Sequence, residues 1–205
     1  MARNQTARGK IVRRLGVNIY GNGKYDRLLK KKPQGPGHER GRRSRSKISD
    51  YGRQLLEKQK LRFSYGLSEK QFFNTFVKAK KLGGLTGDNM MILLERRLDN
   101  VVYRLGMATT RSQARQFVGH GHIRINGKRS NVPSMLVGEG DEIQVRETDA
   151  SKKLIRESLA HSNQVMPAWL AVDGDALKGT VERLPYRTDI ASVANEQMVV
   201  EFYSK

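Results

Sequence analysis

Cysteine is absent from this 205-residue sequence, which also contains a single tryptophan. Without cysteine the chain forms no disulfide and offers no thiolate to a zinc ion. It also lacks a run of roughly 18 apolar residues and the apolar core of a signal peptide, which predicts that no segment enters a membrane. We therefore expect a soluble protein in the cytoplasm or in the matrix of an organelle.

Motifs of enzymes are missing as well. The sequence has no glycine-rich phosphate loop, no nucleotide-binding signature and no serine, histidine and aspartate set. Asp99, followed by Asn100, could be interpreted as a catalytic acid, but a contact in the amino-terminal turn of a helix or an ion pair with a neighbouring arginine explains it better. The sequence predicts a protein that is not an enzyme and that binds no cofactor.

Acidic residues are scarce, since 20 aspartates and glutamates stand against 39 lysines and arginines, for a formal net charge of +19. Residues 1–50 hold 15 basic and 3 acidic side chains, residues 51–93 hold 8 and 3, and residues 94–205 hold 16 and 14. Self-repulsion of this size is tolerable mainly when a polyanion neutralises it. Composition therefore favours a nucleic acid as the partner.

The amino-terminal segment, residues 1–48, is basic and contains few apolar residues. Such a segment buries too little surface to offset the entropy lost on ordering. We expect an extended tail that stays loose until RNA orders it. The candidate RNA-binding residues of this segment are Arg3, Arg8, Lys10, Arg13, Arg14, Arg42, Arg43, Arg45 and Lys47.

Residues 49–93 have the pattern of helices. Ser49 or Asp50 can cap the first helix, and Ser68 with Gln71 has the spacing of a capping box for the next one. These helices make a marginal core by themselves, because the smallest domains bury proportionally little surface. On the face of the first helix that we expect to be outward, the candidate RNA-binding residues are Lys58 and Arg62.

Arginines alternate with apolar anchors from residue 94 onward. Apolar side chains recur at helical spacing and leave the arginines largely off the apolar stripe, until Gly106 ends the helix as a left-handed cap. We expect a helix that opens at Thr86 to run into this one. The stripe consists of Leu94, Leu98, Val101, Val102 and Leu105. The candidate RNA-binding residues beside it are Arg97 and Arg104.

A second helix of this region is predicted to begin after Thr110, which can cap it. Gln113, three residues later, completes the pattern of a capping box. Arg111 and Arg115 are four residues apart, so we expect them to point the same way on the outer face of this helix. They are the strongest candidates for RNA contact.

A β-hairpin is predicted after that helix. Ile123 and Ile125 alternate with Arg124 up to Asn126 and Gly127, the dipeptide that favours a type I′ turn. The candidate RNA-binding residues of the hairpin are Arg124, Lys128 and Arg129. Further along the chain, residues 132–184 predict short strands and one helix, and the apolar run at residues 198–203 predicts a buried β-strand.

Three segments of the sequence resemble a known protein family. The segments SDYGRQLLEKQKLRFSYGLSEKQF at residues 49–72, LERRLDNVVYRLG at residues 94–106 and VEFYSK at residues 200–205 are similar to the fourth protein of the small ribosomal subunit, of bacterial or plastid type. Residues 94–129 resemble the RNA-binding module that is named after this family. The resemblance covers nearly the whole chain in order.

The resemblance implies an α+β fold. A module of two helices and a small β-sheet would be inserted into a helical first domain, to which a carboxyl-terminal strand returns. On this basis residues 1–48 form a basic extension, residues 49–93 form the helical domain completed by residues 185–205, and residues 94–184 form the RNA-binding module with a β-rich continuation.

The resemblance also implies a function. The chain would be a structural constituent of the small ribosomal subunit that binds its ribosomal RNA, nucleates assembly of the subunit body and contributes to translational accuracy. The expected partners are small-subunit ribosomal RNA, neighbouring small-subunit proteins, notably the fifth, and messenger RNA near the channel through which it enters. We expect shape recognition through phosphates, because side chains cannot enter the deep groove of A-form RNA.

The sequence departs from the family in two respects. Some members carry an amino-terminal cysteine cluster that binds zinc, and its absence here predicts no metal. Pro36-Gly37-His38 departs from the family's Pro-Gly-x-His-Gly element, which weakens any role for His38. His120 and His122 would point to opposite faces of an extended segment, so we expect no metal site there either.

Alternatives from other classes remain. A non-ribosomal RNA chaperone carries the same module, as do enzymes that modify RNA, although the chain around the module is too short for their catalytic domain. A DNA-binding protein would need a recognition helix with base-reading side chains, for which Gln113 and Gln116 give little support.

If Arg111 and Arg115 face outward, replacing both by glutamate should weaken RNA binding far more than it lowers thermal stability. Equal damage to thermal unfolding would mean that these arginines are structural.

Overall fold

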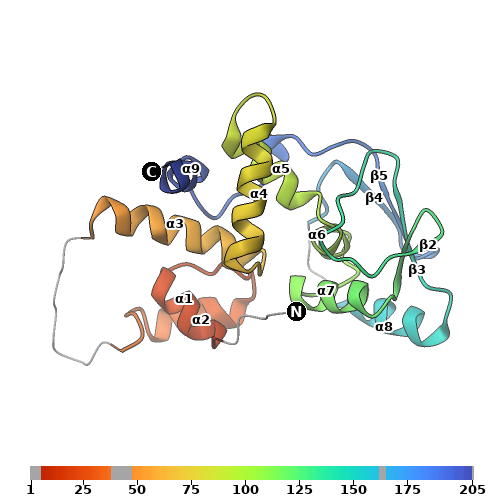
Figure 1. The fold of residues 1–205 in the computed structure, drawn as a ribbon. Helices are drawn as coiled ribbons and strands as arrows, with labels where there is room; N and C mark the ends of the chain where they lie inside the picture. The colour runs from red at the N-terminus through yellow and green to blue at the C-terminus, as the bar shows by residue number, and fades with distance from the viewer. Residues whose placement is uncertain (1–5, 38–47, 162–164, 205) are drawn as a thin grey trace. The chain divides into compact units, whose positions relative to one another are not determined.

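A computed structural model describes residues 6–37, 48–161 and 165–204. The chain forms two compact units, one made of Met1–Lys78 with Ser192–Lys205 and the other of Ala79–Ala191. Figure 1 shows the helices of the first unit and the mixed helices and strands of the second. None of the described helices is long and apolar enough to span a bilayer.

Every helix or strand among the described residues of the first unit is a helix. The capping box predicted from Ser68 and Gln71 is confirmed, since the Gln71 amide donates to Ser68 Oγ and the Ser68 amide donates to Gln71 Oε1, both at 3.3 Å. Ser49 Oγ accepts from the Gly52 amide and caps the helix before it. The helices are α1 (Arg8–Leu15), α2 (Gly23–Lys31), α3 (Asp50–Ser64), α4 (Glu69–Lys81, which ends in the second unit) and α9 (Glu196–Ser204).

The prediction of an extended, loose amino-terminal segment is wrong for residues 6–37, which contain α1 and α2. Ile11, Val12 and Leu15 share one face of α1 and are buried together with Ile19. The apolar partner that the segment lacks locally comes from α3, whose Leu56 and Phe63 pack against this cluster. A short amphipathic helix is stabilised by such tertiary contacts, which composition does not reveal.

The predicted carboxyl-terminal strand is also wrong, because residues 196–204 form helix α9. Asn195 caps it by accepting from the amides of Gln197 and Met198. Short apolar runs fit both a buried strand and a helix. Here Val199, Phe202 and Tyr203 have the three- and four-residue spacing of one helical face, and α9 packs on α3 (Figure 1).

A buried lysine of α3 holds helix α9 in place. Lys58 of α3, which we expected to face solvent, has a side chain only 7% exposed. Its Nζ lies 2.7 Å from Glu69 Oε1 and 4.6 Å from the ring centre of Phe202. Tyr203 Oη donates to the same Glu69 oxygen at 2.7 Å. One carboxylate thus joins α3, α4 and α9.

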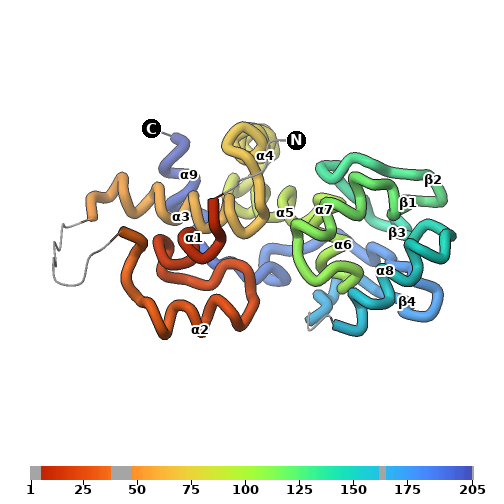
Figure 2. The backbone as a smooth tube through the Cα atoms, turned by 90° about the horizontal axis from the view of Figure 1, so that it is seen from below, coloured from red at the N-terminus to blue at the C-terminus, as the bar shows by residue number. Residues whose placement is uncertain are grey.

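The second unit is an α+β fold, as predicted. The five strands of its described residues form one antiparallel sheet in the order β2-β1-β3-β5-β4. Figure 2 shows α6 and α7 side by side next to this sheet. The elements are α5 (Thr86–Glu95), α6 (Leu98–Arg104), α7 (Arg111–Gly119), β1 (Ile123–Ile125), β2 (Lys128–Arg129), β3 (Glu142–Val145), α8 (Asp149–Ala160), β4 (Leu170–Asp173), β5 (Lys178–Val181) and the 3₁₀ turn η1 (Arg187–Asp189).

The core of this unit lies between the sheet and its helices. The apolar stripe predicted from Leu94 to Leu105 is buried throughout, and Trp169 is fully buried with it. Gly179 of β5 permits a close approach to the end of α6, since a Cβ atom there would lie 2.5 Å from Leu105 Cδ1. A larger residue at this position would force the Leu105 side chain to move.

The continuous helix expected from Thr86 to Gly106 is wrong, because the chain breaks between α5 and α6. Arg97 is extended and forms a β-bridge with Leu136. The amide of Leu98 donates to the carbonyl of Met135 at 2.8 Å. A loop distant in sequence therefore supplies the hydrogen bonds that a continuous helix would have made.

The predicted turn at Asn126 and Gly127 is confirmed, with φ angles of +50° and +75° that match a type I′ hairpin. The side chain of Asn126 fixes the tip further. Its Nδ2 donates to Asp141 Oδ1 and its Oδ1 accepts from the Glu142 amide, both at 2.9 Å.

Glu69→Gln should destabilise the first unit by about 1 to 3 kcal/mol at neutral pH, because buried Lys58 loses its charged partner. Partial burial raises the pKa of Glu69, but hydrogen bonds from Lys58 and Tyr203 outweigh it and leave this pKa below the ordinary 4.5. A lowered pKa stabilises the fold above the unfolded value, and this contribution is lost as pH falls through the folded value.

The measurement is urea unfolding of both chains from pH 7 down to pH 3, in which the difference between wild type and variant should shrink on the acid side. Asp50→Asn, at a carboxylate 87% exposed, is the control and should change little. A difference that stays constant over this range contradicts the assignment.

Candidate nucleic-acid interface

Asp99 is the centre of the arginine cluster on α6 and α7. Its side chain is 3% exposed and accepts from two arginines. Arg97 donates from Nε to Oδ1 at 3.0 Å and from Nη2 to Oδ2 at 2.9 Å, and Arg115 donates from Nε and Nη2 to Oδ2 at 2.9 and 2.7 Å. The prediction that Asp99 forms an ion pair with a neighbouring arginine is confirmed.

Glu95, at the end of α5, organises a second pair of arginines. Arg104 donates from Nε and Nη2 to the two Glu95 oxygens at 2.9 and 2.8 Å. Asn100 donates its Nδ2 to Glu95 Oε2 and accepts from Arg111 Nε at 2.7 Å. The Arg111 guanidinium also lies 4.6 Å from the ring centre of Tyr103.

The outward orientation expected for these arginines is therefore wrong in part. Arg97 is buried, and Arg115 has a side chain 20% exposed. Arg104 and Arg111 are half-buried too. All four guanidinium groups are anchored by Asp99, Glu95 or Asn100, which are themselves buried, so the surface is held in place before any partner arrives.

The outer face of the sheet carries a second group of predicted cations. Side chains directly opposite each other in neighbouring strands share a face. Arg124 of β1 lies opposite Arg129 of β2 on one side and opposite Gln144 of β3 on the other. Lys128 is exposed beside the turn, and Arg129 folds over Gly121, where any Cβ atom would clash with its guanidinium.

His120 and His122 border this hairpin. Their rings lie 6.1 Å apart rather than on opposite faces, because His120 caps α7 and is not in a strand. His122 Nδ1 lies 2.8 Å from Ser151 Oγ, and burial with nearby His120 and Arg146 lowers the pKa of His122. Among the described residues no group of three or more potential ligands could hold a metal ion.

The predicted cations of the first unit have several environments. Arg8, Lys10 and Arg14 are exposed on α1, whereas Arg13 donates to the carbonyls of Gln34 and Gly35 and fixes the chain after α2. Arg62 is half-buried over the ring of Phe63 and near Glu69, and Lys58 is buried. The candidates that lie outside the described residues are Arg3, His38, Arg42, Arg43, Arg45 and Lys47.

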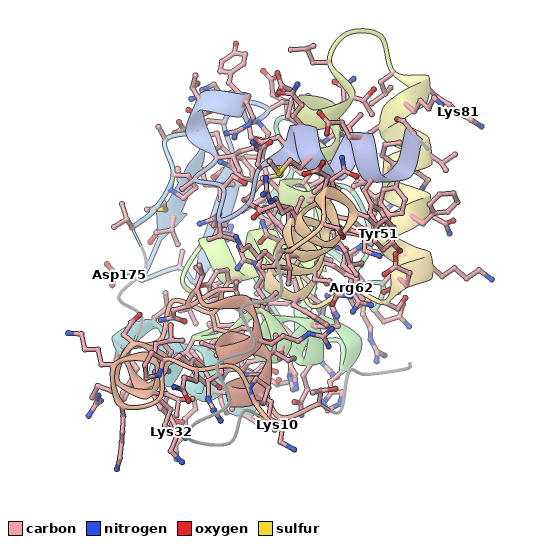
Figure 3. All side chains as sticks on the ribbon, turned by 90° about the vertical axis from the view of Figure 1, so that its left-hand side faces the viewer. Lys10, Lys32, Tyr51, Arg62, Lys81 and Asp175 are labelled. Carbon is pink, nitrogen blue, oxygen red and sulfur yellow. The ribbon has the colours of Figure 1, made fainter. Side chains whose placement is uncertain are left out.

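Sequence reasoning passed over several exposed cations on helices. Their signal was available, because each falls between the apolar positions of an amphipathic helix. In Figure 3 the labelled side chains of Lys10 and Lys81 extend away from their helices. The exposed cations missed include Lys24 and Arg27 of α2, Arg53 of α3, Lys70, Lys78, Lys80 and Lys81 of α4, and Lys153 and Arg156 of α8.

Two family models match the chain. Residues 3–95 match the ribosomal protein S4/S9 N-terminal domain, and residues 96–143 match the S4 domain. The second range holds seven of the predicted cations, which are Arg97, Arg104, Arg111, Arg115, Arg124, Lys128 and Arg129.

Curated relatives match over the full length. The chain is 51% identical over 207 aligned positions to the small ribosomal subunit protein uS4 of Borreliella burgdorferi strain ZS7, covering 100% of this chain and 99% of the relative. It is 54% identical over 198 positions to the protein of the same name from Treponema denticola, covering 97% and 96%. The Borrelia hermsii protein of that name is 50% identical, covering 100% and 99%.

Arg115→Ala should lower the free energy of unfolding by about 1 to 3 kcal/mol, because it removes one of two cations from a buried carboxylate. The control is Arg156→Ala, at an exposed position of α8, which should change it by less than about 0.5 kcal/mol. Urea unfolding measures both.

The double change of Arg111 and Arg115 to glutamate should now damage folding as well as binding, since it brings a carboxylate against Asp99. An unfolding curve equal to wild type contradicts the buried ion pair.

Proposed function

Because the chain belongs to the uS4 family of small ribosomal subunit proteins, we propose that it serves as a structural, non-enzymatic constituent of that subunit by binding small-subunit ribosomal RNA. The observation that carries the proposal is the set of anchored arginines on α6 and α7 beside the exposed cations of the β1–β2 hairpin. Both groups lie within the range that matches the S4 domain.

The chemistry favours phosphates over bases. Guanidinium groups can donate two parallel hydrogen bonds to phosphate oxygens. An arginine that the fold already holds in place loses little conformational entropy when it binds. A-form RNA presents a deep groove that side chains cannot enter, so a preformed surface recognises the shape of a folded junction. Affinity then comes from charge and fit.

The first unit adds a second basic surface. Arg8, Lys10 and Arg14 are exposed on α1, and the Arg8 guanidinium lies 5.4 Å from the ring centre of Tyr20. We assign them, with the basic residues that precede and follow, to phosphate contacts that strengthen binding without sequence preference.

The wider role follows from the family. We propose that binding nucleates assembly of the subunit body and contributes to translational accuracy. The proposed further partners are the fifth small-subunit protein and messenger RNA near the channel through which it enters. The support for these partners is the resemblance of the whole chain to the family.

The second candidate is a non-ribosomal RNA chaperone, or an accessory of an RNA-modifying enzyme, that uses the same module. The match of relatives over the whole chain, including residues before the S4 domain, disfavours it. Footprinting on small-subunit ribosomal RNA separates the two, because the proposed function requires protection at one multi-helix junction. Matched measurements on duplex DNA at the same salt concentration test for general polyanion binding.

Binding should weaken steeply with salt. If about 8 to 10 phosphates are neutralised, the log-log slope of the association constant against salt should be roughly −6 to −9. The slope is measured by filter binding at potassium chloride concentrations from about 50 mM to about 300 mM. A slope near −1 contradicts the proposal.

Replacing Arg124, Lys128 and Arg129 together by alanine should reduce the magnitude of that slope by about 2 to 3, from the rule of 0.7 to 0.9 per contact. The matched control removes three cations from α8, at Lys152, Lys153 and Arg156. If the control loses as much slope and affinity as the hairpin variant, the hairpin has no special contact with RNA.

A further inference from the structure

Asp99 is an unexpected residue at a surface proposed to bind a polyanion. A carboxylate there repels phosphate, and its burial costs solvation free energy. Its position is nonetheless central, since it contacts Arg97 of the chain break and Arg115 of α7 at the same time. A role in arranging cations accounts for both the position and the burial.

We propose that Asp99 is a positioning residue for RNA recognition, which it serves by fixing the guanidinium plane of Arg115. This inference rests on the proposed function. Nε and Nη2 of Arg115 both donate to Oδ2 of Asp99, so one edge of the guanidinium is committed to the protein. The plane of the group is thereby set before RNA arrives.

Arg97 makes this arrangement possible. It bridges both oxygens of Asp99 from the buried side, so it neutralises the carboxylate without competing for the surface. Two arginines therefore share one carboxylate, and of the two Arg115 is the more exposed, with a side chain 20% exposed against 8% for Arg97. Asp99 therefore presents a cation of fixed orientation rather than an anion.

A positioning role and a purely electrostatic role predict changes of opposite sign. Asp99→Asn makes the chain more positive by one unit, which by charge alone tightens binding to RNA. If Asp99 positions Arg115, binding weakens instead, by about ten-fold, because the arginine regains its rotamer freedom. Glu157→Gln, an equal charge change at an exposed position of α8, is the matched control and should bind as wild type or slightly tighter.

A second variant keeps the charge constant. Arg115→Lys preserves the cation but cannot make the two-donor contact with one carboxylate oxygen. We expect a similar loss of affinity, whereas Arg156→Lys on α8 should bind as wild type. If Asp99→Asn fails to fold, Arg115→Lys still tests the inference. In that variant the buried carboxylate of Asp99 keeps Arg97 as its ion-pair partner, so we expect the chain to fold.

The experiment is a titration of folded small-subunit ribosomal RNA with the full-length chain, in which the active fraction and the dissociation constant are fitted separately. A merely structural role lowers the active fraction and leaves the dissociation constant of the folded molecules unchanged, which overturns the inference. The inference is also overturned if Asp99→Asn and Arg115→Lys bind RNA as tightly as their control variants while wild type binds normally. If wild type itself fails to bind, the proposed function fails first.

Discussion

Two buried carboxylates hold the basic surface of the second unit together. Glu95 and Asp99 stand on either side of the break between α5 and α6 and bind four arginines, two directly at Asp99 and two at or through Glu95 and Asn100. A carboxylate buried without partners would be costly, and so would arginines packed against one another. The carboxylates and the arginines therefore offset each other's cost. The chain break at Arg97 brings Glu95, Asp99 and the four arginines close enough to form these contacts.

Local signals in the sequence were sufficient for the parts of both units that local geometry determines. Ser68 and Gln71 make both predicted hydrogen bonds of a capping box. Thr110 accepts from the Gln113 amide as predicted, but the Gln113 side chain accepts from Thr109 rather than from Thr110. Asn126 and Gly127 form the predicted turn, because few other dipeptides adopt positive φ at both positions without strain. The apolar stripe of residues 94–105 is buried as predicted, since side-chain periodicity survives even where the helix itself is interrupted.

Features that depend on distant segments could not be predicted in this way. The break at Arg97 depends on hydrogen bonds with residues 133–137, and no residue near Arg97 in the sequence predicts these bonds. Lys58 has the pattern of a solvent-facing residue until α9 returns from the far end of the chain to cover it. The same return makes residues 196–204 a helix, because α3 offers an apolar helical face and the described part of the first unit offers no strand edge.

The position of the charges also changes what the charge count means. Residues 94–205 are nearly balanced in sequence, with 16 basic and 14 acidic side chains, so most of the excess positive charge lies in the first half of the chain. In the fold, Glu95 and Asp99 face inward and orient arginines, so they do not oppose an approaching phosphate as exposed acids would. Net charge governs attraction at a distance, whereas a fixed guanidinium governs fit at contact. Under the proposed function, the strongly basic amino-terminal part would serve the first step, and the anchored arginines of residues 96–143 would serve the second.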